Sequence, residues 1–439
     1  MTRARTDEGL TLALDLGTSY LKAVAFDASE AIVAIARVPM TYDRPGADRF
    51  EMPLERFHAM IPAALDQLDL DRRRIARIAF STQANTFACF DTHDRPLTPL
   101  IFWHDRRADA GLLSPLSSLP EFSRRTGLPG VFPLIMPAKA RWLQQTRPEC
   151  WSRARRVRFI GDELAHWLTG RNVTEPGYAA LSGLLDIHDA AWWPQACAAV
   201  GLEPSMLGEP VRAGTDLGPL NADAATTLGL PRDVHVHMGC LDQYTGAIGT
   251  ANADRVGPQP GHVSTTLGTV LATVRCTRSP VAGEGVFTGP AWRDGLYFQM
   301  VFGSTSANLL EHYRDTLPDR PDFGELDLLA SLAEVPEDLV IAAAEGDAPI
   351  EQSFAAVQPH HTRGQVTRAI LERVARSLEE QVQRLCGDAP PPTLHLAGGG
   401  ARSELWRSIL TRRVGPVTTA PTPEPTALGA ARLIALQPT

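Results

Sequence analysis

The chain has 439 residues, 44% of them hydrophobic and 21% charged, and its formal net charge is -8. That length predicts two domains, and the composition is typical of a soluble globular protein. The negative charge gives no electrostatic reason to expect nucleic acid, no apolar run reaches the roughly 18 residues that cross a bilayer, and the cysteines form no Cys-x-x-Cys pair. We therefore expect a cytoplasmic protein without nucleic-acid or membrane partners.

Two segments far apart in the chain share one design. Residues 12–27 predict a strand, a tight turn and a second strand, and residues 262–274 repeat this pattern. The turns lie at Gly17 and Thr18 in the first segment and at Gly268 and Thr269 in the second. We expect two related domains that face one ligand, residues 1–249 and residues 250–439, joined by a segment rich in glycine and proline.

A single carboxylate, Asp242, follows an alternating run at residues 234–238 and precedes the small residues of 243–248. The pattern predicts a strand followed by a helix. An acid at the carboxyl end of a strand lies where α/β proteins bind ligands. The alternative is a helix N-cap, because an aspartate before a helix often has that role alone.

A third glycine-rich segment comes late in the chain. Residues 393–397 alternate like a strand, and residues 398–410 predict an amphipathic helix that begins with three glycines. Such glycines let a flat or anionic ligand approach the backbone, and tight packing is the less favoured alternative. Further helices are predicted at residues 365–385 and after Thr426, where core packing is sufficient explanation.

In this order the segments resemble the FGGY family of carbohydrate kinases. The motifs that carry the resemblance are Asp15-Leu-Gly-Thr-Ser19, Phe102-Trp-His-Asp-Arg-Arg107, Gly239-Cys-Leu-Asp242, Thr266-Leu-Gly-Thr269, Gly398-Gly-Gly-Ala-Arg-Ser403 and Ala427-Leu-Gly-Ala-Ala431. The resemblance implies an α/β fold of two actin-like, ribonuclease-H-like ATPase domains with a cleft between them. It also implies a transferase that phosphorylates a sugar or polyol with ATP and Mg²⁺, as a monomer or a homodimer.

The resemblance assigns a role to each motif. Asp242 would be the catalytic base, which takes the proton of a sugar hydroxyl as its oxygen attacks the γ-phosphorus of ATP. Asp15 would hold Mg²⁺, because oxygen ligands suit this ion. Backbone N–H groups and hydroxyls of the turns would bind phosphates, and the late glycines would pack against adenosine. The nucleotide residues implied are Gly17, Thr18, Ser19, Gly268, Thr269, Gly398, Gly399, Gly400 and Ser403.

The same resemblance implies a set of substrate-binding residues. They are Gln83, Asn85, Trp103, Asp105, Arg107 and Gln243. Arg107 is equally well explained as a structural ion-pair partner. The stretch Gln83-Ala-Asn85 differs from Gln-Arg-Glu of glycerol kinases and from Gln-Met-His of xylulokinases. Glycerol is therefore disfavoured, and a pentulose or a related ketose or polyol is expected, with xylulose itself open.

The chain departs from the family at residues 344–354. Ketose kinases usually carry a Pro-x-x-x-Gly-Glu-Arg-x-Pro loop there, whereas this segment is shorter and lacks the Glu-Arg pair. Weaker domain closure would let water reach the γ-phosphate. We expect an atypical short member of the family. The alternatives are a degenerate kinase that senses sugar or nucleotide, a glycerol or alditol kinase, and a chaperone-type ATPase.

Overall fold

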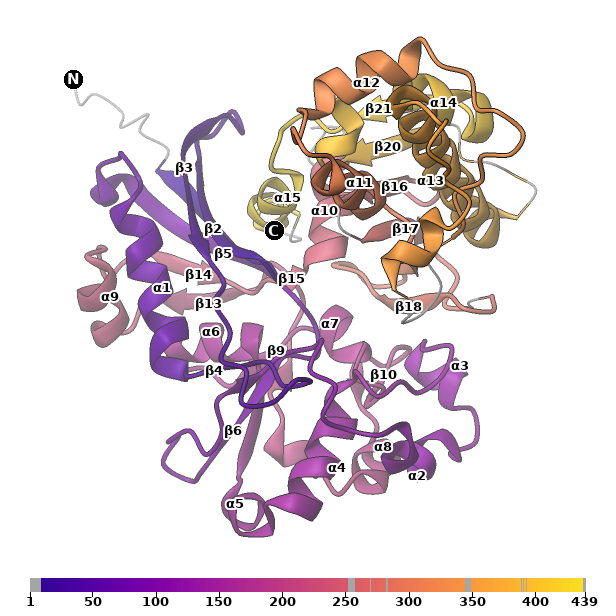
Figure 1. The fold of residues 1–439 in the computed structure, drawn as a ribbon. Helices are drawn as coiled ribbons and strands as arrows, with labels where there is room; N and C mark the ends of the chain where they lie inside the picture. Colours follow the sequence, from indigo (N-terminus) through magenta and orange to yellow (C-terminus); the bar gives the residue numbers. More distant parts are fainter. Residues whose placement is uncertain are drawn as a thin grey trace, which may run out of the picture.

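The computed structural model describes residues 9–251, 257–268, 270–281, 283–343, 349–387, 389, 391 and 393–436. Two α/β units make up the molecule, each built on one mixed sheet, and a pair of helices lies between them (Figure 1). None of the helices in these ranges combines the length and apolar character that a membrane span requires.

The first sheet contains the predicted hairpin. β1 (Leu10–Leu16) pairs antiparallel with β2 (Tyr20–Phe26) and parallel with β5 (Ile75–Thr82), and the strand order is β13-β14-β5-β1-β2-β3. Nearly every side chain of β1 is buried, because both faces of the sheet are covered. The other strands are β3 (Ile32–Pro39), β13 (Asp216–Pro219), β14 (His235–His237) and β15 (Cys240–Leu241), which pairs with β5.

A long insertion follows β5 and forms the lower part of this unit in Figure 1. The small sheet of this lower part has the order β4-β7-β6-β8, and its strand β4 comes from the segment before β5. The strands here are β4 (Glu51–Met52), β6 (Phe87–Phe90), β7 (Leu100–Ile101), β8 (Arg156–Phe159), β9 (Val173–Thr174), β10 (Leu185–Asp186), β11 (Ala191–Trp192) and β12 (Glu209–Pro210). The helices of the unit are α1 (Leu54–Asp66), α2 (Ser114–Ser117), α3 (Phe122–Thr126), α4 (Met136–Thr146), α5 (Pro148–Arg153), α6 (Ile160–Thr169), α7 (Pro176–Ala180), α8 (Pro194–Ala199) and α9 (Ala222–Leu228).

The second sheet repeats the first, as the two hairpin patterns predicted. β16 (Val263–Leu267) pairs antiparallel with β17 (Leu271–Thr277) and parallel with β20 (Leu394–Ala397), in the order β18-β19-β17-β16-β20-β21. The remaining strands are β18 (Phe287–Pro290), β19 (Tyr297–Gly303) and β21 (Val417–Thr419). The helices are α11 (Asn308–Thr316), α12 (Phe323–Ser331), α13 (Arg363–Cys386) and α14 (Glu404–Val414).

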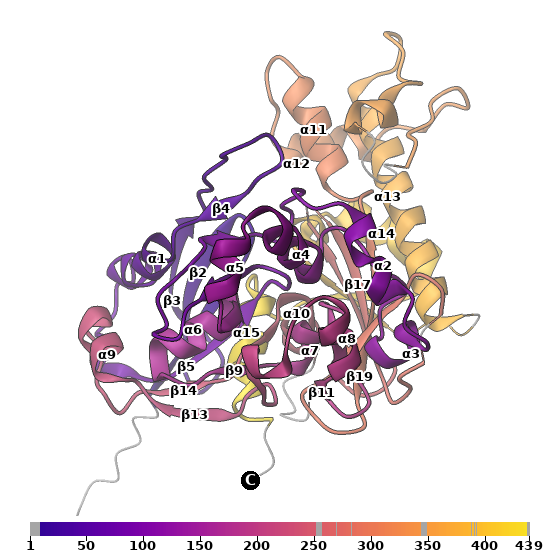
Figure 2. The same ribbon diagram turned by 90° about the horizontal axis from the view of Figure 1, so that it is seen from below.

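Two helices each follow one sheet in the chain but pack against the other sheet. α10 (Asp242–Thr250) follows the first sheet in the chain but lies against β16, β17 and β20. α15 (Pro425–Leu433) follows the second sheet, yet its Leu428 packs in one apolar cluster with Ala13 and Ala79 of the first. Both ribbon views show α10 and α15 side by side at the centre of the molecule (Figures 1 and 2).

The two helices touch backbone to backbone. A Cβ on Gly249 would lie 1.8 Å from the carbonyl oxygen of Pro425, and a Cβ on Gly429 would lie 1.8 Å from that of Thr245. Arg432 extends the contact by donating to the carbonyl oxygens of Ile248 (3.2 Å), Gly249 (3.5 Å) and Ala251 (2.8 Å), where α10 ends. Glycine is required at this crossing because no side chain fits between the helices.

Most predicted elements are confirmed, but one predicted helix begins later in the chain than expected. Residues 398–410 do not form one helix: a 3₁₀ turn at Gly399–Arg402 is followed by α14 from Glu404. Ser403 separates them with extended backbone (φ -69°, ψ 121°) and caps α14 by accepting a hydrogen bond from the Trp406 N–H. Serine favours such an N-cap over a helix interior, which explains the break.

Candidate active site

The carboxyl ends of three parallel strands meet at one edge of the first sheet. Asp15 of β1 pairs with Ser81 of β5, and Ser81 pairs with Cys240 of β15. The three strands therefore end level with one another. Asp242 follows β15 directly as the first residue of α10, so the two predicted acids lie at the same edge.

Asp242 does not act as a side-chain helix cap. The N-cap position belongs to Leu241, and the Asp242 carboxylate accepts a hydrogen bond from the adjacent Gln243 N–H (2.7 Å) rather than from the next turn of the helix. Burial, reinforced by the negative charge of Asp15, raises the pKa of Asp242 to about 7. A carboxyl group with that pKa can accept a proton at neutral pH.

Asp15 is buried, with 5% of its surface exposed, and is only partly neutralised. Ser81 Oγ donates to its Oδ1 (2.7 Å), and Lys22 Nζ lies 3.5 Å from its Oδ2. Burial raises the pKa of Asp15 although Lys22 and Ser81 both oppose the rise. A buried carboxylate that its protein partners do not fully compensate suits a nearby cation, so Asp15 fits the predicted Mg²⁺ role.

Lys22 connects this edge to the far end of the chain. Its Nζ donates to Glu424 Oε2 (2.9 Å), and Arg37 forms a second ion pair with the same carboxylate. Glu424 is 5% exposed and immediately precedes α15. Lys22 was not predicted from the sequence, although a turn at residues 17–19 places it opposite Asp15 across the hairpin. Nothing local in the sequence points to Glu424.

Two predicted substrate residues brace the turn at Gly17 and Thr18. Trp103 Nε1 donates to Thr18 Oγ1 (3.1 Å), and Gln83 Nε2 approaches the Gly17 carbonyl oxygen (3.4 Å). Thr86 links them, because its hydroxyl donates to Gln83 Oε1 (2.9 Å) and accepts from the Trp103 N–H (3.0 Å). The structure thus brings Gln83 and Trp103 to the site edge, in contact with the turn.

Asn85 has its side chain bound within the protein. Its Nδ2 donates to the Leu181 carbonyl oxygen (2.9 Å), and its Oδ1 accepts from the Met136 N–H (2.9 Å) at the start of α4. Its own φ is +60°, in the left-handed region that asparagine tolerates better than most residues. These contacts fix the chain direction after β5.

Lys139 of α4 is a buried cation that was not predicted from the sequence. Its ammonium approaches three backbone carbonyls, those of Phe102 (2.9 Å), Trp103 (3.0 Å) and Asn85 (3.4 Å). Burial lowers the pKa of Lys139 to about 7. The signal in the sequence is a lysine between Ala138 and Ala140, where helix periodicity alone does not distinguish a buried cation from a solvated one.

Asp105 and Arg107 form a buried ion pair. Arg107 donates from Nε to Asp105 Oδ1 (2.8 Å) and from Nη2 to Oδ2 (2.7 Å), and it also bonds Glu51 Oε1 (2.6 Å). The Asp105 carboxylate also accepts from the Phe50 N–H (2.7 Å). Burial opposes ionisation, but these bonds outweigh it and hold the pKa of Asp105 below its usual value. The pair anchors the neighbouring segment, which agrees with the structural ion-pair role that the sequence left open for Arg107.

The second sheet presents a matching edge. Thr266 of β16 is level with Ala397 of β20, so the turn at Gly268 and the loop at Gly398 lie side by side. Ser306 donates to the Gly268 carbonyl oxygen and holds this turn from a loop that no sequence pattern had singled out. The predicted partner Thr269 lies outside the described residues.

The three late glycines have different surroundings. Gly398 has φ +88°, and a Cβ there would lie 2.6 Å from the Leu267 carbonyl oxygen; a Cβ on Gly400 would lie 2.3 Å from the Trp406 ring. Gly399 has no atom within 4 Å of its Cβ position. Ser403 Oγ donates to Asp327 Oδ1 (2.5 Å) while capping α14. Packing therefore explains two glycines, and Gly399 alone faces open space.

Gly399→Val is therefore expected to weaken ATP binding about tenfold or more while the fold stays intact, because its branched side chain enters the space that the nucleotide would occupy. Titration calorimetry with ATP measures the change. Gly130→Val is the matched control, since Gly130 also has no atom within 4 Å of its Cβ position but lies in the other unit. Unchanged ATP affinity in a folded Gly399→Val protein would contradict the assignment.

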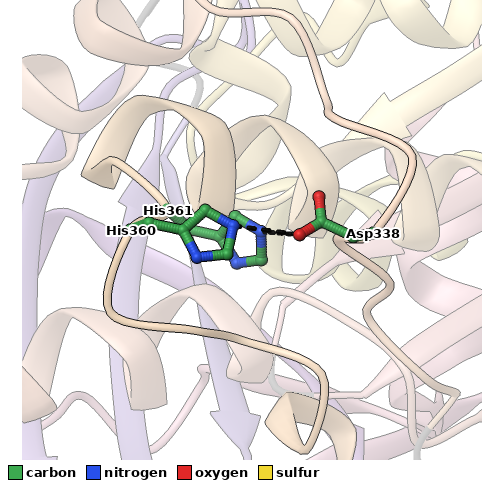
Figure 3. A group of neighbouring side chains, drawn as sticks. All are labelled: Asp338, His360 and His361. Atoms are coloured by element: carbon green, nitrogen blue, oxygen red, sulfur yellow. Dashed lines mark hydrogen bonds and ion pairs between the residues drawn. The ribbon is translucent and has the colours of Figure 1, made fainter.

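One further group has the composition of a metal site. Oδ2 of Asp338 lies 2.9 Å from His360 Nε2 and 3.2 Å from His361 Nε2 (Figure 3). However, His361 Nδ1 accepts a hydrogen bond from the Gln358 N–H (3.0 Å), so its neutral ring carries the proton on Nε2. That nitrogen lies 3.2 Å from Asp338 Oδ2 without a hydrogen bond, and because it carries the proton it has no free lone pair for a metal. The hydrogen bond between His360 and Asp338 connects two loops.

Comparisons with known proteins agree with this arrangement. The N-terminal domain of the FGGY family of carbohydrate kinases matches residues 10–249, and the C-terminal domain matches residues 300–437. A xylulose kinase from Lactococcus lactis is 26% identical over 421 residues, 89% of this chain and 80% of that protein. A glycerol kinase from Koribacter versatilis is 27% identical over 451 residues, 96% of this chain and 88% of that protein.

Solved structures show the same fold. A ligand-bound xylulose kinase from Lactobacillus acidophilus has a TM-score of 0.84 at 19% identity, covering 97% of this chain and 88% of that chain. Plasmodium falciparum glycerol kinase with ADP has a TM-score of 0.82 at 19% identity over the same shares. The predicted α/β fold of two actin-like domains with a cleft between them is confirmed.

Proposed function

Because the chain belongs to the FGGY family of carbohydrate kinases, we propose that it transfers the γ-phosphoryl group of ATP to a hydroxyl of a pentulose or a related ketose or polyol. One observation carries the proposal: Asp242, with its pKa raised to about 7, stands at the strand edge that also holds Asp15 and the turn at Gly17. Phosphoryl transfer requires a positioned base and charge neutralisation at one place.

The reaction assigns each group a part. The substrate oxygen forms a bond to the γ-phosphorus, the bond from phosphorus to the bridging oxygen breaks, ADP leaves, and the substrate proton passes to Asp242. The turns at Gly17 and Gly268 and the loop at Gly399 hold the nucleotide from both sides. Lys22 offsets part of the charge of Asp15 and links it to Glu424. A Mg²⁺ ion bound at Asp15 supplies further neutralisation of the phosphates.

The substrate class is supported by relatives and by one free side chain. Gln83, Asn85, Asp105 and Arg107 are engaged within the protein, so they orient the site and leave few groups for a sugar. The Gln243 side chain, next to Asp242, has no hydrogen bond within the described part of the chain and is available to a second hydroxyl. Similarity to xylulose kinases supports a pentulose, whereas a glycerol kinase that is 27% identical, against 26% for the xylulose kinase, makes glycerol the alternative that experiment must test.

A substrate panel tests the proposal. We expect ATP-dependent phosphorylation of ribulose, xylulose or a related polyol. The value of kcat/KM should exceed that for glycerol by about tenfold or more. The reason is that a protein group left without its substrate hydroxyl in a closed site costs about 1–3 kcal/mol. Product formation is measured by coupled ADP release with a blank that contains no sugar. Glycerol as the best substrate would contradict the substrate class, and nucleotide binding without turnover on any sugar would favour a sensor.

The pH dependence of kcat/KM follows from the raised pKa of Asp242. The base works only when ionised, so kcat/KM is expected to rise with pH through about 7 and then level off. A cation held at Asp15 shifts the midpoint downward, because it offsets the charge that helps to raise the pKa. Initial rates in a constant-ionic-strength buffer series measure this, and a profile that falls between pH 5 and 8 would exclude a carboxylate base.

A further inference from the structure

Lys139 occupies a place in α4 that burial and helix geometry both disfavour. Its side chain is fully buried, and it is the fourth residue of the helix. The positive end of the helix dipole lies at that end of α4 and opposes a cation there. Removal of an ammonium group from water is also unfavourable unless an anion compensates the charge. A residue that goes against both rules indicates a functional requirement.

No carboxylate compensates the Lys139 ammonium. Throughout the described part of the chain, none has an oxygen within ion-pair distance of its Nζ. The ammonium instead donates to the carbonyl oxygens of Phe102 (2.9 Å), Trp103 (3.0 Å) and Asn85 (3.4 Å). An ammonium group has three N–H donors, so donors and acceptors match in number. The lysine therefore binds backbone groups rather than a charged partner.

The three carbonyls belong to two segments that contact the turn at residues 17–18. Gln83 follows β5 and Trp103 follows β7, and the side chains of both contact that turn. Thr86 links Gln83 and Trp103 through its hydroxyl. Lys139 links the same two segments through their backbones, from the side of α4. The relative positions of Gln83 and Trp103 therefore depend on both links.

We propose that Lys139 is a positioning residue for phosphoryl transfer, an inference that rests on the proposed kinase function. By holding the two segments together, its ammonium keeps the turn at residues 17–18 aligned with Asp242 at the same strand edge. Because its side chain is fully buried, Lys139 does not touch the substrate and acts through Gln83 and Trp103. A displacement of about 1 Å at a reacting group can lower a rate about a hundredfold.

Lys139→Met removes the three hydrogen bonds while nearly keeping the length of the side chain. We expect kcat on the preferred sugar to fall about a hundredfold. The dissociation constant for ATP should stay close to that of the parent protein, because the loops of the second unit are not altered. Steady-state rates and ATP titration measure both quantities at a temperature where the variant is folded. A residue that only stabilised the fold would leave kcat unchanged under these conditions.

Arg158→Met is the matched control. Arg158 is another buried cation of the first unit, 1% exposed, and its side chain donates to Asn172, Glu163 and Asp94. Among the described residues, none of these partners has a hydrogen bond to the turn at residues 17–18. The control should therefore lose stability but retain kcat. A loss of kcat as large as that expected for the lysine substitution would contradict the proposal.

Two further variants keep the proposal testable if Lys139→Met does not fold. Lys139→Gln still offers two N–H groups to the carbonyls, so its kcat should fall less, by roughly tenfold. Thr86→Val removes the other link between Gln83 and Trp103 with little change in volume, and it should lower kcat in the same direction. Parent-like kcat in folded Lys139→Gln would overturn the proposal, as would parent-like kcat in Thr86→Val.

Hydrogen exchange tests the positioning without the kinase reaction. In the Lys139 variants the amides of residues 83–86 and 102–105 should exchange about tenfold faster or more, while exchange in α13 stays the same. Unchanged exchange in the two segments would overturn the inference whatever the substrate is. Faster exchange with parent-like kcat would leave Lys139 a structural role alone. A parent protein that phosphorylates no sugar would refute the proposed function, and this inference with it.

Discussion

Asp242→Asn is expected to lower turnover by roughly 10²–10⁴ while ATP binding is retained, because an amide of nearly the same shape cannot accept the substrate proton. Asparagine can still take the hydrogen bond from the Gln243 N–H, so the start of α10 should not move. Steady-state rates and ATP titration on the same preparation measure both quantities. Full activity in this variant would remove the proposed mechanism.

The same substitution should stabilise the protein at neutral pH. The pKa of Asp242 is about 7 in the folded chain, against an ordinary value of 3.8, so between these values the folded state binds more protons than the unfolded state. The contribution of this group to stability therefore falls as pH rises through that window. The Asp242→Asn variant lacks this carboxyl group. Its free energy of unfolding in urea should therefore exceed that of the parent protein by an amount that increases from pH 4 to pH 7. A helix-cap role predicts the reverse, lower stability with little change in turnover.

Gly429→Ala is expected to destabilise the protein by about 3 kcal/mol or more, which is the upper end of overpacking effects. The added Cβ would lie 1.8 Å from the Thr245 carbonyl oxygen, and neither backbone can yield without separating α10 from α15. Because α10 begins at Asp242, activity should fall together with stability. Denaturant unfolding and turnover at a temperature where the variant is folded measure the two effects.

Gly246→Ala is the matched control for this crossing. Gly246 lies on α10 near the same contact, but a Cβ there would meet only Thr426 Oγ1 at an ordinary 3.7 Å. Alanine also favours a helix over glycine by about 1 kcal/mol, so this variant should be as stable as the parent or more stable. Equal losses in both variants would show that the crossing tolerates no substitution for a reason other than backbone contact.

The sequence predicted the elements of the site better than the partners of its side chains. Hairpin periodicity and glycine turns located both sheet edges at which we propose that phosphate binds, because these patterns are local. The position of Asp242 at a strand end was predicted for the same reason. The break at Ser403 was missed, since apolar periodicity continues through it while capping chemistry interrupts the helix.

Most of the side-chain partners that the sequence did not predict are distant in the chain. Asp105 was predicted to bind a substrate hydroxyl or to brace the groups that do, and the sequence did not show that its carboxylate is held by the Phe50 N–H, 55 positions away in the chain. Lys139 reaches carbonyls 36 to 54 positions away. No spacing rule connects such residues, because their proximity depends on how the insertion after β5 packs.

The exchange of α10 and α15 means that the chain cannot be divided into two self-sufficient fragments. A cut between residues 249 and 250 would deprive the first fragment of α15, exposing Ala13, Val24 and Ala79, which pack against Leu428. The second fragment would lose α10, whose Tyr244 ring lies 4.6 Å from that of Phe298. Each fragment would carry the missing cover of the other, so the two should fold only when expressed together. During synthesis, one face of the first sheet stays uncovered until α15 has been made.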